Sequence, residues 1–148
     1  ITQADRMTLY ERVGGAESVQ VLADAWHRRV LADPVVEHAF SHGFDENHVA
    51  RLAAYWAQAW GGPDTFTTTM GDEATVVEIH SHQGIHPDMD ERAERCFIDA
   101  THDIDLPDEV RTELLDYWRW ATKNMNAYPH ETDVVPTSIP FAEWPPGD

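Results

Sequence analysis

Apolar side chains recur along most of this chain at spacings of three and four residues, which place them on one face of a helix. The clearest set, between Ser18 and Leu31, consists of Val21, Leu22, Ala25, Trp26 and Val30. Comparable sets predict further helices over Leu9 to Val13, over 34–40, from 44–46 through Trp56, from Pro87 onward and from Pro107 onward. The pattern therefore predicts an all-α fold.

Glycine and proline mark the ends of the predicted helices. Gly14-Gly15 follows the first helix, and Gly61-Gly62-Pro63 follows a helix rich in aromatic residues. Glycine permits a positive φ and proline cannot continue a helix, so both pairs predict sharp helix ends. Asp33 before Pro34 is typical of an N-cap followed by a first helical proline.

Two stretches lack the helical pattern. Residues 63–80 look like a loop, in which 65–69 tolerates a strand that has no partner. After Tyr128 the repeated prolines exclude regular structure. We expect this tail to lie along the surface, with Ile139, Phe141 and Trp144 as its anchors.

Composition narrows the class of protein. A length of 148 residues and 42% hydrophobic residues fit a single globular domain. The formal net charge of -17 argues against nucleic acid and anionic membranes as partners. A single cysteine, Cys96, excludes an internal disulfide and is typical of a reducing compartment, so we expect a cytoplasmic protein in which Cys96 is a small buried side chain.

His80 is the first candidate for a functional residue, because neutral imidazole is a strong metal ligand and His80 follows the second glycine pair. From spacing alone, a loop histidine is more often a solvated or capping residue than a metal ligand. His82 is a rival ligand if the turn is shifted. A non-haem site built from His80, His82 and His86 with acidic neighbours lacks the helical spacing of a dedicated metal site.

The order of several motifs resembles the group II truncated haemoglobins, short globins in which two helix pairs pack two-over-two around haem. The motifs are Thr8-Leu9-Tyr10-Glu11-Arg12-Val13-Gly14-Gly15, Asp33-Pro34, Trp60-Gly61-Gly62-Pro63, His80 and Leu114-Leu115-Asp116-Tyr117. The resemblance implies a globin domain over 1–127 and a proline-rich extension over 128–148 that packs on the surface or leaves it.

The resemblance also implies roles for individual residues. His80 falls at the proximal iron ligand, and Phe40 at the aromatic residue that packs on the haem face. His48 falls on the distal helix facing the sixth coordination position, with Leu52 one turn later. Arg51 matches a residue that pairs with a haem propionate, and Tyr55 belongs to the same haem-binding set.

Two positions depart from the family pattern. His27 stands where the family has a distal tyrosine, and Ala93 stands where it has a tryptophan over the haem. Both of those family residues donate hydrogen bonds to iron-bound oxygen, so the usual stabilising network is in doubt. Ala93 should leave a void or an access path.

The resemblance implies haem b as the cofactor, with three readings of its use left open. The first is binding of O2, NO, cyanide or sulfide at a site that contains histidine. The second is a peroxidase or oxygenase in which His27 and His48 serve as distal acid and base for peroxide and a small organic substrate. The third is a six-coordinate bis-histidine protein for electron transfer or sensing. A reductase partner and the choice between monomer and homodimer stay open.

Overall fold

The computed structural model describes residues 7–38 and 47–147, and these form helices joined by turns and loops. The helices are α2 (Leu9–Val13), α3 (Ala16–Ala32), α4 (Pro34–His38), α5 (His48–Ala59), α6 (Thr65–Thr69), α7 (Glu73–His80), α8 (Pro87–Asp103) and α9 (Asp108–Met125). The described part of the chain contains no strand, which confirms the predicted all-α class.

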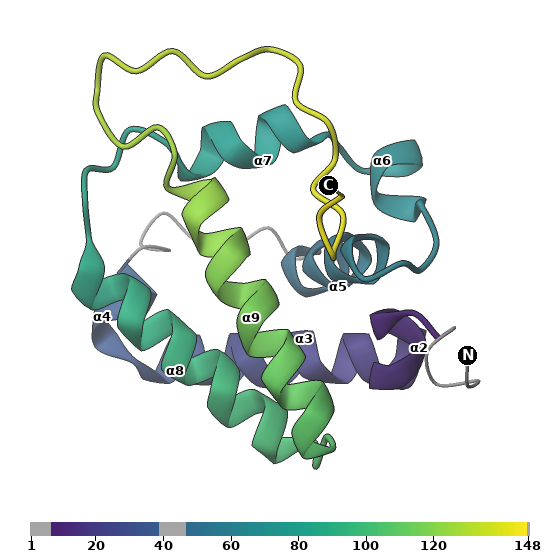
Figure 1. Cartoon of the computed structure of the whole chain (residues 1–148). Helices are drawn as coiled ribbons and strands as arrows, with labels where there is room; N and C mark the ends of the chain where they lie inside the picture. The colour runs from purple at the N-terminus through teal and green to yellow at the C-terminus, as the bar shows by residue number, and fades with distance from the viewer. Residues whose placement is uncertain (1–6, 39–46, 148) are drawn as a thin grey trace.

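The long helices form two packed pairs. Helix α3 packs against α5, and α8 packs against α9; the two pairs meet mainly where α3 contacts α8. Helix α7 lies apart from α3 and α8 and contacts α9 (Figure 1). This is the two-over-two arrangement that the family resemblance implied.

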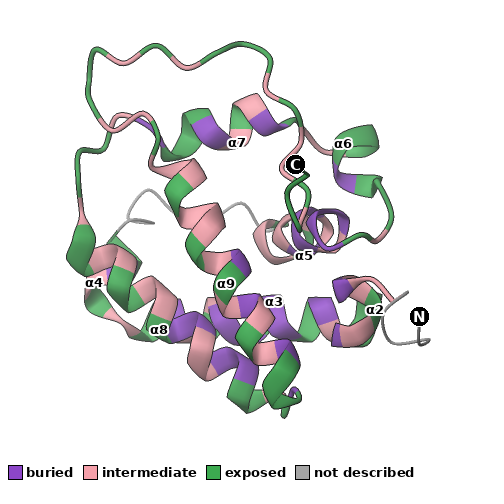
Figure 2. Ribbon diagram, in the orientation of Figure 1, coloured by how far each residue is buried: buried purple, intermediate pink, exposed green. Residues whose placement is uncertain are grey.

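An aromatic and aliphatic core lies where the helices cross. Leu22, Trp60, Phe97, Leu114 and Tyr117 are each at most 1% exposed. In Figure 2 the buried positions gather along α3, α5 and the lower part of α9. Cys96 is buried beside this core, as predicted. None of the described helices is long and apolar enough to cross a membrane.

The predicted loop over 63–80 is wrong, because this stretch contains α6 and α7. Asp72 caps α7, accepting a hydrogen bond from the Thr75 backbone N–H at 2.8 Å. The spacing of apolar residues did not predict α7, because its short apolar run, Val76, Val77 and Ile79, consists of β-branched residues, which favour strands over helices. His80 is consequently the last residue of a helix and not a loop residue.

The glycine pairs end helices as predicted. Gly14 has φ 119° and caps α2, while Gly61 has φ 96° after α5. At Gly62 a Cβ would lie 2.6 Å from the Tyr10 ring and 2.8 Å from the Ala57 carbonyl oxygen. The second pair therefore lets α2 and the end of α5 approach closely.

The chain after α9 arches over α7 and returns to α5 (Figure 1). It has no helix or strand over 127–147, as the prolines predicted. Phe141 packs on Tyr55 and Phe66. The Trp144 backbone N–H donates to the Ala59 carbonyl at 2.8 Å. Phe141 and Trp144 are thus attached to α5, and Ile139 is half-buried.

Candidate functional site: a histidine-lined haem site

His80 ends α7 with its ring fixed by its own helix. Nδ1 lies 2.8 Å from the carbonyl oxygen of Val76. A carbonyl only accepts hydrogen bonds, so Nδ1 carries the hydrogen and Nε2 is left with a lone pair. Metal-bound histidines typically donate their second ring N–H in this way, which orients the ring and fixes the tautomer.

The surroundings of His80 favour the neutral ring. Desolvation lowers the pKa of His80 below its ordinary value by more than the hydrogen bond to Val76 raises it, and the nearby charge of His86 lowers it further. The side chain nevertheless counts as exposed. The ring therefore has an accessible edge, although neighbouring protein atoms desolvate it. A neutral imidazole with an accessible Nε2 is the form that binds a metal.

The rival histidines are engaged elsewhere. Nε2 of His82 lies 2.8 Å from the Asp133 carbonyl oxygen, so it donates to the tail. Nδ1 of His86 lies 2.9 Å from a carboxylate oxygen of Asp90. No group of three or more histidine, cysteine or acidic side chains among the described residues could hold a metal ion. The non-haem alternative finds no support in this part of the chain.

His27 and His48 come together from two different helices. His27 lies on α3 and His48 is the first residue of α5, and their ring centroids are 5.5 Å apart. Both side chains are half-buried. Packing of α3 against α5 therefore brings together the two histidines that the sequence singled out separately.

Of the other predicted haem contacts, the structure describes Leu52 and Arg51 but not Phe40. Leu52 is half-buried one turn after His48, and Arg51 donates from Nη2 to the Met70 carbonyl at 3.2 Å. Phe40 lies outside the described residues. Arg51 thus secures the link between α6 and α7.

Trp26 lies against Ala93, the residue that the resemblance places at the family's tryptophan position. Its indole Nε1 donates to the Ala93 carbonyl oxygen at 3.2 Å. Ala93 is half-buried and packs against the core. The expected void or access path at Ala93 is therefore bordered by the indole of Trp26, which belongs to α3.

Glu73 is a buried acid that sequence reasoning missed. At 2% exposure it accepts hydrogen bonds from the Tyr55 hydroxyl at 2.9 and 3.0 Å and from the Ala142 backbone N–H at 3.2 Å. Desolvation raises the pKa of Glu73, and it also raises the pKa of Tyr55. Tyr55, predicted as a haem contact, here joins α5 to the start of α7. The sequence showed only an acid in a first helical turn.

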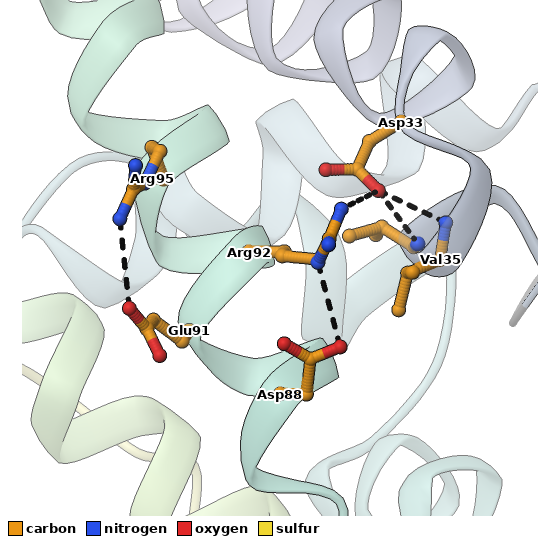
Figure 3. A network of polar contacts seen from close by, with 7 residues as sticks. Asp33, Val35, Asp88, Glu91, Arg92 and Arg95 are labelled. Carbon is orange, nitrogen blue, oxygen red and sulfur yellow. Dashed lines mark hydrogen bonds and ion pairs between the residues drawn. The ribbon is translucent and has the colours of Figure 1, made fainter.

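A second polar network joins α4 to α8 (Figure 3). Asp33 accepts from the backbone N–H groups of Val35 and Val36 at 2.9 and 3.3 Å, as the predicted N-cap should. Arg92 lies 3.4 Å from Asp33 and 3.4 Å from Asp88. These hydrogen bonds and the charge of Arg92 lower the pKa of Asp33 despite desolvation. The network fixes the helix next to Ala93.

Comparison with known proteins shows the family to which the chain belongs. The family model for bacterial-like globins matches residues 8–126. The chain belongs to the bacterial-like globin family. This globin is 34% identical over 83 residues to the group 1 truncated hemoglobin GlbN of Synechocystis sp., an alignment that covers 55% of this chain and 67% of that protein. Membership implies a haem-binding truncated globin.

Solved structures agree with the fold. The hemoglobin of the thermophilic phototrophic bacterium Chloroflexus aurantiacus superimposes on this globin with a TM-score of 0.71 at 26% identity, covering 81% of this chain and 98% of that one. The group II truncated hemoglobin of Bacillus anthracis gives a TM-score of 0.72 at 23% identity, covering 85% and 95%. The comparisons thus include both group 1 and group II proteins and leave the group open.

Proposed function

We propose that this truncated globin binds haem b through Nε2 of His80 and holds O2 or another small ligand beside His27 and His48. The observation that carries the proposal is the hydrogen bond from Nδ1 of His80 to the Val76 carbonyl. It leaves Nε2 as the accessible lone pair on a ring whose lowered pKa keeps it neutral.

The residues around His80 suit an apolar macrocycle. Ile79, next to His80 in the sequence, is 64% exposed, and Ile85, five residues after His80, is 80% exposed. A bound macrocycle at His80 would be able to cover exposed apolar side chains of this kind. Arg51 is the proposed partner of a haem propionate.

Haem would supply an iron that binds diatomic ligands and exchanges electrons. The protein's own part is to orient His80 through Val76 and to present imidazole nitrogens to the bound ligand. A neutral imidazole has one nitrogen that donates and one that accepts, so His27 and His48 can donate a hydrogen bond and accept a proton at the same site.

A second candidate, a haem peroxidase, is favoured by the 5.5 Å separation of the His27 and His48 rings. One neutral imidazole nitrogen would accept the proton of the peroxide, and the same nitrogen would return it to the leaving oxygen. This candidate function includes a small organic molecule as substrate, an oxygenase reaction as its variant and a reductase as a partner.

The finer assignments are also proposals. We propose membership in group II, supported by the motifs around the glycine pairs. We further propose a globin domain over 1–127, an extension over 128–148 and a cytoplasmic location.

The test is titration of haem into the haem-free protein, followed by the Soret band. We expect one equivalent to bind to the native chain and retention to be lost in His80→Ala. His82→Ala is the matched control, two residues away, and should retain haem. Loss in His82→Ala with full retention in His80→Ala would overturn the ligand assignment, and no Soret band at all would overturn haem binding.

Spectra of the same samples distinguish the remaining readings. A low-spin six-coordinate spectrum that becomes high-spin in His48→Ala would identify the bis-histidine reading. Peroxide-dependent turnover of a phenol that is lost in His27→Ala would identify the peroxidase. Turnover no faster than free haemin would remove the peroxidase and leave ligand binding.

A further inference from the structure

All six tryptophans of the chain belong to one connected set of rings. Successive ring centroids are 6.1 Å apart for Trp26 and Trp56, 5.5 Å for Trp56 and Trp60, 5.5 Å for Trp60 and Tyr117, and 6.0 Å for Tyr117 and Trp144. Trp118 and Phe97 flank this series, and Trp120 lies 5.5 Å from Trp144. The rings run from α3, through the core, to the tail.

The inner end of the series lies at the proposed distal site. Trp26 precedes His27, and its indole donates to the backbone of Ala93. The outer end is Trp144, which is half-buried near the end of the described chain. The series therefore connects the proposed haem site with the protein surface.

The indole N–H groups of the series differ in the group that could accept their proton. Nε1 of Trp60 is buried and has no hydrogen-bond partner within the described residues. Nε1 of Trp26 donates to an amide carbonyl, which is a very weak base. Nε1 of Trp144 donates to a carboxylate oxygen of Glu113 at 3.0 Å. Of these three indoles, Trp144 alone has a carboxylate that can accept its proton.

This difference decides where an oxidised ring is trapped. Removal of one electron makes an indole N–H strongly acidic, so the radical is stabilised where a base takes the proton. Glu113 is held 2.7 Å from Arg12, which keeps the carboxylate in place beside Trp144. Burial raises the pKa of Tyr117, so its hydroxyl does not readily give up a proton, and the ring is not a place where the radical is trapped.

We propose that Trp144, with Glu113 as its proton acceptor, is a surface site at which this globin oxidises electron-rich aromatic amines. The inference rests on the proposed haem site and on its second candidate function, the peroxidase, and it takes hydrogen peroxide as the oxidant. Peroxide with two protons and two electrons becomes two waters. Each electron leaves Trp144 through the ring series, while the indole proton passes to Glu113.

The donor restores the site in a balanced step. One aromatic amine gives one electron to the Trp144 radical and becomes a radical cation, and the proton on Glu113 returns to the indole nitrogen. Two donors are consumed for each peroxide, together with two protons from solvent. The net charge of -17 favours a neutral or cationic amine over an anionic donor.

The experiment uses the full haem-loaded chain, peroxide and tetramethyl-p-phenylenediamine as the donor. In the native protein we expect a neutral tryptophan radical in freeze-quenched electron paramagnetic resonance spectra. Without donor, mass spectrometry should locate oxygen addition at Trp144. Trp144→Phe should lose this radical and most of the donor oxidation, while its Soret band stays unchanged.

Matched variants separate the parts of the proposal. Trp120→Phe, its ring neighbour, should keep the radical. Glu113→Gln should change the neutral radical into a short-lived cation, whereas Glu109→Gln, one turn earlier on α9, should not. Unchanged radical and donor oxidation in Trp144→Phe, or an unchanged neutral radical in Glu113→Gln, would overturn the proposal.

Failure of haem binding is separable from failure of this inference. If the chain does not retain haem, flash photolysis with a ruthenium trisbipyridine sensitiser and persulfate oxidises the protein directly. Persulfate takes the electron from the sensitiser, and the oxidised sensitiser takes one from the protein. Trp144 should still be the modified indole, and modification spread equally over Trp120 and Trp144 would overturn its assignment.

Discussion

Helix α7 holds His80 through polar contacts with distant parts of the chain, whereas α3 and α5 hold His27 and His48 by packing into the apolar core. The first turn of α7 is tied to Tyr55 and to the tail by Glu73. Along α3, by contrast, Leu22 and Val30 are fully buried. Apolar packing is undirected and spread over many contacts, while a buried carboxylate concentrates its effect in a few hydrogen bonds. Helix α7, which carries the proposed proximal ligand, can therefore be loosened without unfolding α3 and α5, which carry the proposed distal histidines.

The largest effect should come from the core beneath the distal histidines. Leu22→Ala on α3 removes a fully buried side chain and should lower the free energy of unfolding by about 2–5 kcal/mol. Urea denaturation followed by circular dichroism measures this. Because the core supports both sides, haem retention and distal ligand binding should weaken together.

Leu31→Ala is the matched control on the same helix. Leu31 is 45% exposed, so its removal should change stability by no more than about 0.5 kcal/mol. Equal losses in the two variants would show that the burial of α3 does not govern stability.

The second-largest effect should come from Glu73 and be confined to α7, the helix that carries His80. Glu73→Ala leaves the Tyr55 hydroxyl and the Ala142 N–H without their acceptor, which should cost about 1–3 kcal/mol. The release rate of haem to an excess of a haem-scavenging globin should rise, because α7 is no longer tied to α5. Distal ligand affinity should change little.

A double-mutant cycle with Tyr55→Phe isolates the contact. The coupling energy between Tyr55 and Glu73 should be about 0.5–3 kcal/mol, whereas Glu78→Ala, an exposed position on α7, should couple with neither. Additive losses from Tyr55→Phe and Glu73→Ala would contradict the tie between α5 and α7.

The third effect belongs to the distal side. His27→Ala or His48→Ala should each weaken cyanide binding to the ferric haem protein by the value of one hydrogen bond, about 0.5–1.5 kcal/mol. Optical titration with cyanide measures it. His102→Ala, an exposed histidine on α8, should have no effect. Unchanged affinity in both distal variants would remove these rings from the ligand site.

Sequence reasoning reached the helices whose apolar faces are long and regular. It predicted α3, α8 and α9 and the glycine turns, because these depend on local periodicity and local backbone freedom. It missed α7, whose short apolar run is β-branched and whose capping residue, Asp72, follows a glycine. It also misread the setting of His80 for the same reason.

The sequence predicted only those members of the candidate site that stand out by residue type alone, namely the histidines. His80, His27 and His48 could be singled out one by one, and the contact between α3 and α5 brings the last two together. The contact of Glu73 with Tyr55 and Ala142 joins residues 18 and 69 positions apart. Such a tie depends on how the tail folds back, and no local pattern indicates it.

The smallest effect should be a dependence of stability on pH that comes from Glu73. Desolvation raises the pKa of this carboxyl in the folded protein above its unfolded value. The folded state therefore binds the proton more tightly, and the Glu73 contribution to stability is fully present below the unfolded pKa. It is lost as the pH rises through the folded pKa.

The measurement is the difference in unfolding free energy between the haem-free native protein and Glu73→Gln across this pH range. The difference is required because other carboxyls act in the opposite direction: hydrogen bonds lower the pKa values of Asp72 and Asp103. Relative to the glutamine variant, the native protein should lose stability as the pH rises. A native protein that instead gains stability over this range would mean that Tyr55 and Ala142 stabilise the carboxylate by more than burial destabilises it, and the tie on α7 would then be strongest in its charged form.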